Sequence, residues 1–219
     1  MKQNPTRTHL YEQVARIGKA LSSSKRLEII ELLAQGEQTV DVLAQRCGID
    51  IRLASAHLRA LREARLVESS REGKFIRYRL SGPDIAQLWL TLRGTAEEHL
   101  IELRIALEQM ATQPDALLSE SRESLLAKAR SGELVVIDVR PGDEFAAGHL
   151  PHARSMPLEE LEQRIADLLP GKEIVAYCRG PFCLMSDEAV RLLRARGFSA
   201  SKISDGVTEW STNGMPLDR

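Results

Sequence analysis

Two short apolar runs in the second half of the chain constrain its fold more than any other feature. Residues 134–139 read LVVIDV and residues 174–178 read IVAYC, and neither shows the polar alternation of a half-exposed strand. Apolar residues at helical spacing follow at 158–169 and 187–197, and a short third strand is expected at 201–205. This alternation of strands and helices predicts an α/β unit with a parallel sheet.

The first half of the chain predicts helices and a single hairpin. Apolar residues recur at helical spacing in five segments: 8–21, 25–34, 40–46, 51–63 and 84–110. Thr39 and Asp50 are suited to cap the third and fourth of these helices. Residues 66–80 alternate apolar and polar positions about Arg71-Glu72-Gly73, which is typical of a β-hairpin. Helices, a hairpin and a closing helix in this order describe an α+β, mostly α, winged helix-turn-helix.

A break in the pattern separates the two halves. Thr112-Gln113-Pro114-Asp115 interrupts the helical spacing and is interpreted as a linker. A chain of 219 residues has room for two domains, each large enough to bury a core. We therefore expect two domains, a winged helix-turn-helix at residues 1–112 and an α/β domain at residues 117–219.

The bulk properties favour a cytoplasmic protein without a membrane partner. No apolar run approaches the roughly 18 residues of a membrane span. The first residues lack the apolar core of a signal peptide. Three cysteines are an odd number, which argues against a disulfide scaffold and favours a reducing compartment.

Positive charge gathers where the winged helix would contact DNA. Residues 50–79 contain eight Lys/Arg and four Asp/Glu, although the whole chain has a net charge of −1. The helix at 51–63 would enter the major groove of a double-stranded operator by its N-terminal residues. The residues expected to contact DNA are Arg52, Ser55, His57 and Arg59 on that helix and Lys74 and Arg77 on the hairpin. His57 has an alternative role in packing within its helix.

The stretch VDVLAQRCGIDIRLASAHLRALREARLVESSREGKFIRYRL resembles the ArsR-type winged-helix repressors, and the resemblance spans roughly residues 8–110. It implies a homodimer that pairs through the first and last helices. Many such repressors bind a metal through cysteines at the third helix or through acidic and histidine side chains on the last. Here the third helix has no thiol at its start, and only His99 and Glu102 share a face of the last helix. We therefore expect no metal site. A metal- or metalloid-responsive repressor that uses His99 and Glu102, or Cys178 and Cys183, is kept as an alternative.

Cys178 ends the second apolar run and begins the loop Cys178-Arg179-Gly180-Pro181-Phe182-Cys183, which leads into a helix. Converging backbone N–H groups and the positive end of a helix dipole both favour thiolate over thiol. The thiolate is the nucleophile, so Cys178 is a candidate catalytic residue.

The stretch DVRPGDEFAAGHLPHARSMPL at 138–158, the Cys178 loop and the closing segment DGVTEWSTNGMPL resemble the rhodanese domain, in family order. The resemblance implies that Cys178 takes a sulfane sulfur from a small donor and passes it, as a persulfide, to an acceptor thiol. It implies that Arg179 recognises an anionic donor. Asp138, Arg140 and Glu144 are expected to form a supporting polar network, and Trp210 is expected to pack.

The loop departs from a familiar family pattern, C-R-S-G-x-R, because Cys183 stands where a second arginine is usual. This departure puts ordinary thiosulfate turnover in doubt and leaves room for a larger anion such as arsenate. Cys183 has three readings: it resolves a modified Cys178 into a bridge, it tunes the loop, or it is buried as a small apolar residue.

Together the halves predict a transcriptional regulator whose operator affinity changes when Cys178 carries a persulfide. The main alternative is a sulfurtransferase or arsenate-type oxyanion reductase with a DNA-tethering domain. None of these hypotheses requires a cofactor.

Overall fold

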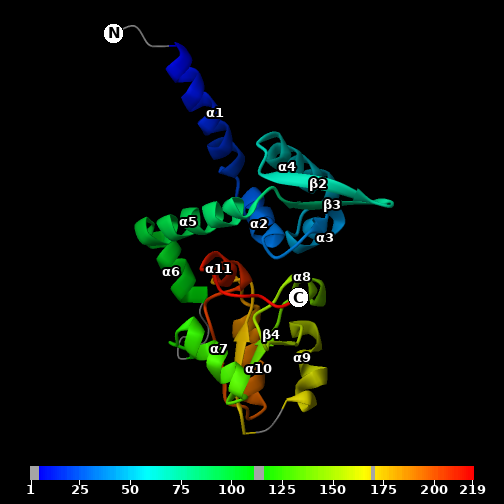
Figure 1. Ribbon diagram of the computed structural model, residues 1–219, viewed down its shortest axis with the longest axis vertical. Helices are drawn as coiled ribbons and strands as arrows, with labels where there is room; N and C mark the ends of the chain where they lie inside the picture. The colour runs from blue at the N-terminus through cyan, green and yellow to red at the C-terminus, as the bar shows by residue number, and fades with distance from the viewer. Residues whose placement is uncertain (1–4, 111–115, 169–170) are drawn as a thin grey trace. The chain divides into compact units, whose positions relative to one another are not determined.

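The computed structural model describes residues 5–110, 116–168 and 171–219 (Figure 1). Its contacts divide the chain into two compact units, Met1–Trp89 and Leu90–Arg219. The expected linker at 112–115 lies outside the described residues. The division into domains at 1–112 and 117–219 therefore stays a prediction.

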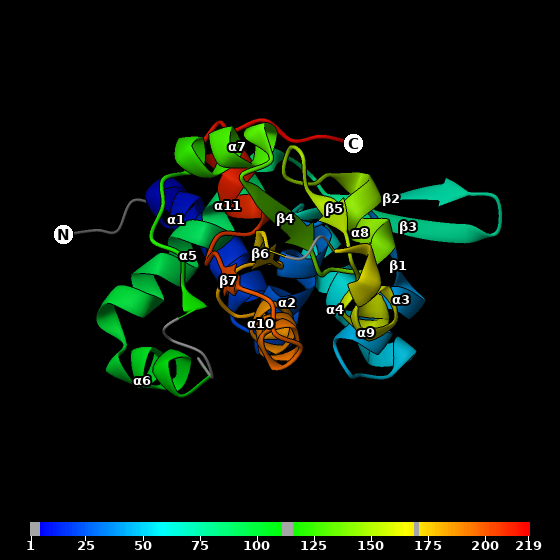
Figure 2. The ribbon, with the colours of Figure 1, turned by 90° about the horizontal axis from the view of Figure 1, so that it is seen from below.

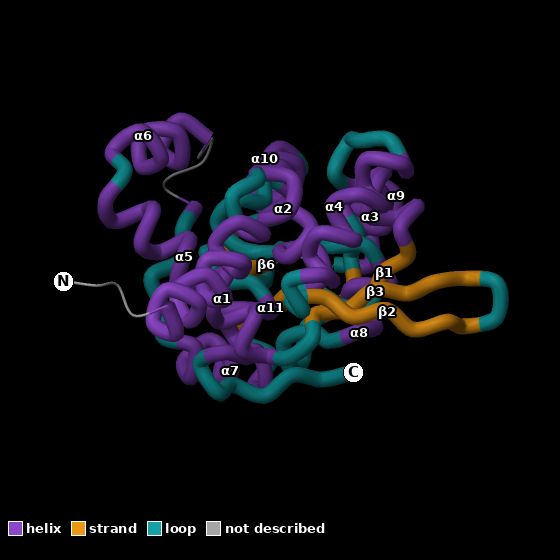
Figure 3. The backbone as a smooth tube through the Cα atoms, turned by 90° about the horizontal axis from the view of Figure 1, so that it is seen from above, coloured by secondary structure: helices purple, strands orange, loops and turns teal. Residues whose placement is uncertain are grey.

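The first unit is a winged helix-turn-helix. Its elements are α1 (Pro5–Leu21), α2 (Ser24–Leu33), β1 (Gln38–Thr39), α3 (Val40–Arg46), α4 (Ile51–Glu63), β2 (Val67–Glu72), β3 (Phe75–Leu80) and the start of α5 (Pro83–His99). The strands form an antiparallel sheet in the order β1-β3-β2. Figure 3 shows β2 and β3 as a long hairpin that extends beyond the helices of this unit, which is the expected wing.

The wing turns slightly later than the sequence pattern suggests. Arg71 and Glu72 still belong to β2 and pair with Ile76 and Phe75, so the reversal falls at Gly73 and Lys74. Gly73 has a φ of +61°, a conformation that glycine adopts without steric cost. The hairpin is confirmed, and only its turn is displaced.

The expected continuous helix at 84–110 is wrong. The chain forms α5 up to His99 and then a separate α6 (Ile101–Met110). The carbonyl of Leu100 accepts hydrogen bonds from the N–H groups of Leu103 and Arg104, so Leu100 begins the second helix. Leu100 is 52% exposed, and no residue of α6 is buried. The apolar side chains of residues 100–110 therefore do not pack into a core that would hold α5 and α6 in one helix.

The second unit is an α/β domain. After α6 it contains α7 (Arg122–Ser131), β4 (Leu134–Asp138), α8 (Gly142–Ala147), β5 (Arg154–Ser155), α9 (Leu158–Arg164), the 3-10 turn η2 (Ile165–Asp167), β6 (Glu173–Tyr177), α10 (Met185–Ala195), β7 (Ala200–Lys202) and α11 (Val207–Thr212). Its four strands are all parallel, in the order β5-β4-β6-β7. The expected parallel sheet is confirmed.

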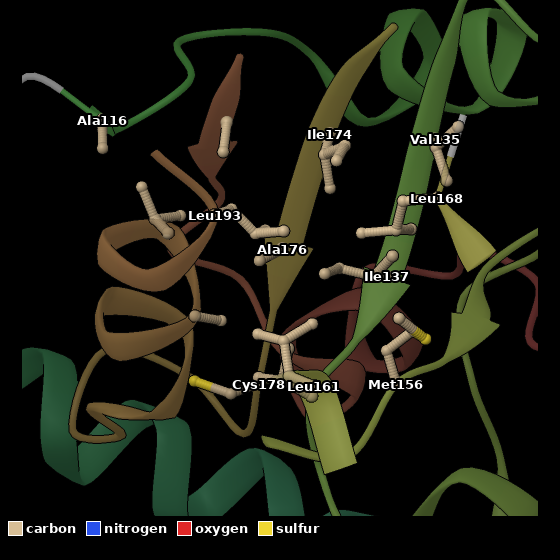
Figure 4. Close-up of a cluster of buried hydrophobic side chains, with 14 residues drawn as sticks. Ala116, Val135, Ile137, Met156, Leu161, Leu168, Ile174, Ala176, Cys178 and Leu193 are labelled. Carbon is tan, nitrogen blue, oxygen red and sulfur yellow. The ribbon is translucent and has the colours of Figure 1, made fainter. Parts of the chain in front are cut away.

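Helices cover both faces of this sheet (Figure 2). One cluster of buried side chains joins β4 and β6 to α9 and α10, and it includes Ile137, Ala176 and Leu193 (Figure 4). The second cluster joins the opposite faces of the same strands to α7 and α11. Because successive strand residues point to opposite faces, a strand covered on both sides must be apolar throughout, as LVVID is.

Among the described residues, no helix is both long enough and apolar enough to span a membrane.

Candidate functional site

Cys178 directly follows β6, at the carboxyl edge of the parallel sheet, and the loop after it leads into α10. Its side chain belongs to the apolar cluster beneath that helix, and Figure 4 shows its sulfur beside α10. The residue is only 2% exposed. The thiol is therefore held inside its loop.

Ser186, in the first turn of α10, is the nearest polar side chain to this sulfur. Its Oγ lies 3.3 Å from Sγ of Cys178. As a thiol, Cys178 donates to the carbonyl oxygen of Cys183 at 3.2 Å. As a thiolate, it accepts hydrogen bonds from the Ser186 hydroxyl and from the backbone of Ser186 and Gly180.

The hydrogen bonds decide the protonation state of Cys178. Burial alone would raise the pKa of the thiol. Hydrogen bonds from the Cys183 thiol, from Ser186 and from the loop backbone outweigh burial and lower the pKa to about 6. At neutral pH the group is therefore largely thiolate, the nucleophilic form.

Cys183 has the opposite character. The hydrogen bond to the Cys178 sulfur, together with burial, raises the pKa of the Cys183 thiol well above its usual value. Cys183 is half-buried and lines a pocket of about 240 Å³ with its loop neighbours Gly180 and Pro181 and with Ser186. Of the two side chains, Cys178 is therefore the thiolate and Cys183 keeps its proton.

Arg179 is tied to Glu144 of α8. Its Nε and Nη2 donate to the two carboxylate oxygens at 2.9 and 2.7 Å. The carboxylate is almost fully buried, so this fork-shaped ion pair fixes the loop to α8. Recognition of an anionic donor by Arg179 stays a prediction, since its charge is neutralised in this state.

Asp138 and Arg140 form a second, fully buried ion pair at the end of β4. Arg140 Nη2 lies 2.5 Å from Asp138 Oδ2 and also donates to the carbonyl of Gly148. The hydroxyl of Tyr177 donates to the same carboxylate at 2.6 Å. The expected network of Asp138, Arg140 and Glu144 is thus two separate ion pairs. The Asp138–Arg140 pair, together with Tyr177, joins the ends of β4 and β6. The Arg179–Glu144 pair holds the loop.

The closing segment of the domain packs directly on the cysteine loop. A Cβ at Gly206 would lie 2.3 Å from the carbonyl oxygen of Arg179, so only glycine permits this approach. The backbone N–H of Gly206 donates to Glu209. Trp210 is buried and donates from Nε1 to the carbonyl of Pro216, as a packing residue does.

The exposed face of α4 carries the expected DNA-contacting residues. Arg52 and Arg59 are exposed and Ser55 is half-buried, and their spacing places them on one side of the helix. Asp50 caps this helix by accepting a hydrogen bond from the N–H of Leu53 at 2.9 Å. The first turn of α4 is therefore held in place with its basic face toward solvent.

His57 lies away from that face. It is half-buried and belongs with Ala54 and Leu61, which are buried on the inner side of α4. Burial, and then the charge of Arg26, lower the pKa of His57. A neutral, half-buried imidazole fits the packing role better than a phosphate contact, and its contact with DNA stays a prediction.

The wing carries its basic residues as ion pairs. Arg77 pairs with Glu72, and Arg79 pairs with Glu68 at 2.9 Å. Lys74 stands at the turn, with its ammonium 5.2 Å from the centre of the Phe75 ring. All three side chains are exposed enough to exchange these partners for phosphates.

The break at Leu100 separates His99 from Glu102, the first residue pair of the metal alternative. His99 ends α5 and Glu102 lies in the first turn of α6, so they do not share the face of one helix. Within the described ranges, His, Cys, Asp and Glu side chains nowhere gather in a group of three or more that could hold a metal ion.

Ser186 and Tyr177 are the two site residues that the sequence reasoning missed. Ser186 lies eight residues after Cys178, and the helix was expected to start one residue beyond it. Tyr177 was assigned only to the strand core. A helix start placed at Met185 would have pointed to Ser186, whereas nothing local indicates that Tyr177 bonds Asp138.

A winged helix-turn-helix joined to a parallel-sheet domain with a thiolate loop defines a DNA-binding regulator of two parts. Residues 23–69 match the family described as "Bacterial regulatory protein, arsR family", and residues 121–213 match "Rhodanese-like domain". The chain belongs to the ArsR family of transcriptional regulators and carries a rhodanese-like domain. Both resemblances and the fold class are thereby confirmed.

The relatives cover the whole chain and each half. An HTH-type transcriptional regulator of Mycobacterium tuberculosis is 41% identical over 99% of this chain and 95% of its own. A sulfurtransferase of Allochromatium vinosum is 26% identical over 45% of this chain and 90% of its own. The homodimeric winged helix-turn-helix DNA-binding domain of a Mycobacterium bovis protein is 43% identical, covering 47% of this chain and 94% of its own, with a TM-score of 0.43.

Proposed function

We propose that this regulator senses sulfane sulfur: Cys178 acquires a persulfide, and the modified protein binds its operator with a different affinity. The observation that carries the proposal is the Cys178 sulfur, held as a thiolate by Ser186 and the loop backbone. Strongly shifted pKa values cluster at functional sites, and a lowered thiol pKa is typical of a reactive cysteine.

The chemistry needs no cofactor. The Cys178 thiolate attacks the terminal sulfur of a polysulfide, a new S–S bond forms, and the shortened polysulfide leaves with the electron pair. The product is a Cys178 persulfide anion in the same loop. The hydrogen-bond donors that stabilise the thiolate are close enough to stabilise this anion as well.

A regulatory effect asks little of the protein in energy. A change in operator affinity of 10- to 100-fold corresponds to about 1.4–2.7 kcal/mol of coupling. The loop that would carry the modification is bound to α8 through Arg179 and to the segment before α11 through Gly206. A shift of the loop therefore reaches more than one element of the domain.

The test is fluorescence anisotropy of the full chain on DNA from upstream of its own coding region. Reduced and polysulfide-treated protein are compared, with Cys178→Ser as the variant and Cys47→Ser as the matched control. We expect polysulfide to change the operator affinity of the chain without substitutions and of Cys47→Ser, but not that of Cys178→Ser. An equal response in Cys178→Ser would contradict the proposal.

The second candidate is a sulfurtransferase, favoured by the same thiolate and by the likeness of the second half to a sulfurtransferase. It predicts steady turnover of thiosulfate or polysulfide with an acceptor thiol. Multiple turnovers whose rate is independent of DNA, together with unchanged operator affinity, would favour the enzyme over the sensor. The same assay with arsenate tests the oxyanion-reductase alternative.

A further inference from the structure

Cys183 is folded back over Cys178 by a tight turn. The N–H of Cys183 donates to the carbonyl of Gly180 at 3.1 Å, which closes the turn. The carbonyl of Cys183 in turn lies 3.2 Å from the Cys178 sulfur, and the two thiols are hydrogen-bonded. The turn therefore brings Cys183, five residues further along the chain, against the Cys178 sulfur.

The two thiols differ in access and in proton. Cys178 is buried and ionised, whereas Cys183 keeps its proton and faces the pocket beside the loop. A persulfide on Cys178 extends by one sulfur from a site that Cys183 already contacts. The proton that a leaving sulfide needs is therefore held beside the bond that would break.

The third cysteine, Cys47, is buried in the first unit, directly after α3. It is not part of the Cys178 loop, and it serves as an internal control for the cysteine variants.

We propose that Cys183 resolves the Cys178 persulfide into a Cys178–Cys183 disulfide and releases sulfide. The Cys183 sulfur forms a bond to the inner sulfur of the persulfide, and the bond between inner and outer sulfur breaks. The outer sulfur leaves with that electron pair and the Cys183 proton as hydrosulfide. The sulfane sulfur is reduced by two electrons, and the two cysteine sulfurs are together oxidised by two.

This step changes what the sensor would signal, and it rests on the proposed function. A disulfide needs Cβ atoms about 4 Å apart with a defined torsion, so it fixes the loop more strongly than an added sulfur atom does. The oxidised state then persists after the donor has gone, until a low-molecular-weight thiol reduces it. The loop would record exposure to sulfane sulfur rather than its instantaneous concentration.

The test follows sulfide released by the full chain after loading. Protein is treated briefly with an organic persulfide, gel-filtered to remove the donor, and then followed by a sulfide assay and intact mass. We expect one sulfide per loaded chain, with the added sulfur replaced by the loss of two hydrogens. Cys183→Ser and Cys183→Ala should keep the extra sulfur on Cys178 and release no sulfide, while Cys47→Ser behaves like the unmodified sequence.

The outcomes separate the two proposals. A stable persulfide in the unmodified sequence, or equal sulfide release from Cys183→Ser, overturns the role of Cys183. If operator affinity still responds to sulfur in that case, the sensor proposal survives. If Cys178 never acquires sulfur, both proposals fail. Circular dichroism of each variant confirms that a negative result does not arise from misfolding.

Discussion

Hydrogen bonds from Cys183, from Ser186 and from the loop backbone distinguish Cys178 from an ordinary buried cysteine. Burial by itself disfavours the thiolate, as it does for any charged group. Cys178 and Cys183 occupy the same loop, yet the pKa of the first is lowered and that of the second is raised. The difference arises from which sulfur receives the hydrogen bonds.

Alkylation of Cys178 should therefore follow the thiolate. The rate should rise as pH increases through about 6 and level off above it, because only the ionised form reacts. Ser186→Ala removes one donor to the anion and should raise the midpoint by roughly one pH unit, as expected for a hydrogen bond to a charged group. The measurement is iodoacetamide alkylation followed by peptide mass spectrometry across pH.

Ser201→Ala is the matched control, since that hydroxyl donates to Glu173 and not to the cysteine loop. Its midpoint should equal that of the unmodified sequence. An unchanged midpoint in Ser186→Ala would show that Cys183 and the loop backbone hold the thiolate without the Ser186 hydroxyl.

The fully buried Asp138–Arg140 pair should dominate the stability of its domain. Asp138→Ala leaves the Arg140 guanidinium buried without its partner and should lower the free energy of unfolding by about 3–5 kcal/mol. Urea denaturation of the full chain, followed by circular dichroism, measures the change. Arg164→Ala breaks only exposed pairs and should cost less than about 1 kcal/mol.

Should Asp138→Ala fail to fold, Tyr177→Phe gives a milder test. It removes one hydrogen bond to the carboxylate and should cost about 1 kcal/mol. A cost for Asp138→Ala similar to that of Arg164→Ala would mean that the buried pair contributes little.

At the scale of elements, α4 shows how local chemistry sets a functional surface. Its bounds are those expected from the sequence, because Asp50 caps its start and apolar residues recur along its inner side. The same helix presents Arg52 and Arg59 outward. Stability of the first turn and display of the basic face are therefore linked.

Asp50→Ala should lower the stability of the first unit by about 1 kcal/mol, because the N–H of Leu53 loses its cap. Asp50→Asn should restore most of this loss, since asparagine caps about as well. Thermal unfolding of both variants provides the comparison. An equal loss in Asp50→Asn would assign the effect to charge rather than to capping.

At the scale of the whole molecule, exposed apolar side chains argue for a second copy of the chain. Leu10 and Val14 on α1 are 62% and 72% exposed, and Ile101 and Ile105 on α6 are also exposed. Large apolar residues gathered on a helix surface mark an interaction site more often than chance exposure does. A homodimer, as the resemblance to ArsR-type repressors implies, would cover them.

Val14→Glu should accordingly shift the protein from dimer to monomer and weaken operator binding by more than about tenfold, because a palindromic operator is read by two subunits. Size-exclusion chromatography with light scattering reports the mass, and anisotropy reports the affinity. Gln13→Glu adds the same charge on the same helix and should leave both unchanged. A dimer that persists in Val14→Glu would place the interface elsewhere.

The amino-acid sequence predicts the order of most elements, the α4 helix and the place of Cys178 between a buried strand and a helix. These features depend on periodicity and capping, which are local properties of the chain. The two-residue strands β1 and β5 were not foreseen, since so short a strand exists only through its pairing. The break at Leu100 was also missed, because apolar spacing alone does not distinguish one helix from two.

The contacts that anchor the cysteine loop and its strand come from residues far apart in the sequence. Arg179 meets Glu144 across 35 residues of sequence, and Tyr177 meets Asp138 across 39. Such pairs arise when parallel strands and their following loops converge on one edge of a sheet, which no local pattern records. Cys178 was therefore visible in the sequence as the candidate nucleophile, whereas the long-range pairs that hold its loop and its strand came from the fold.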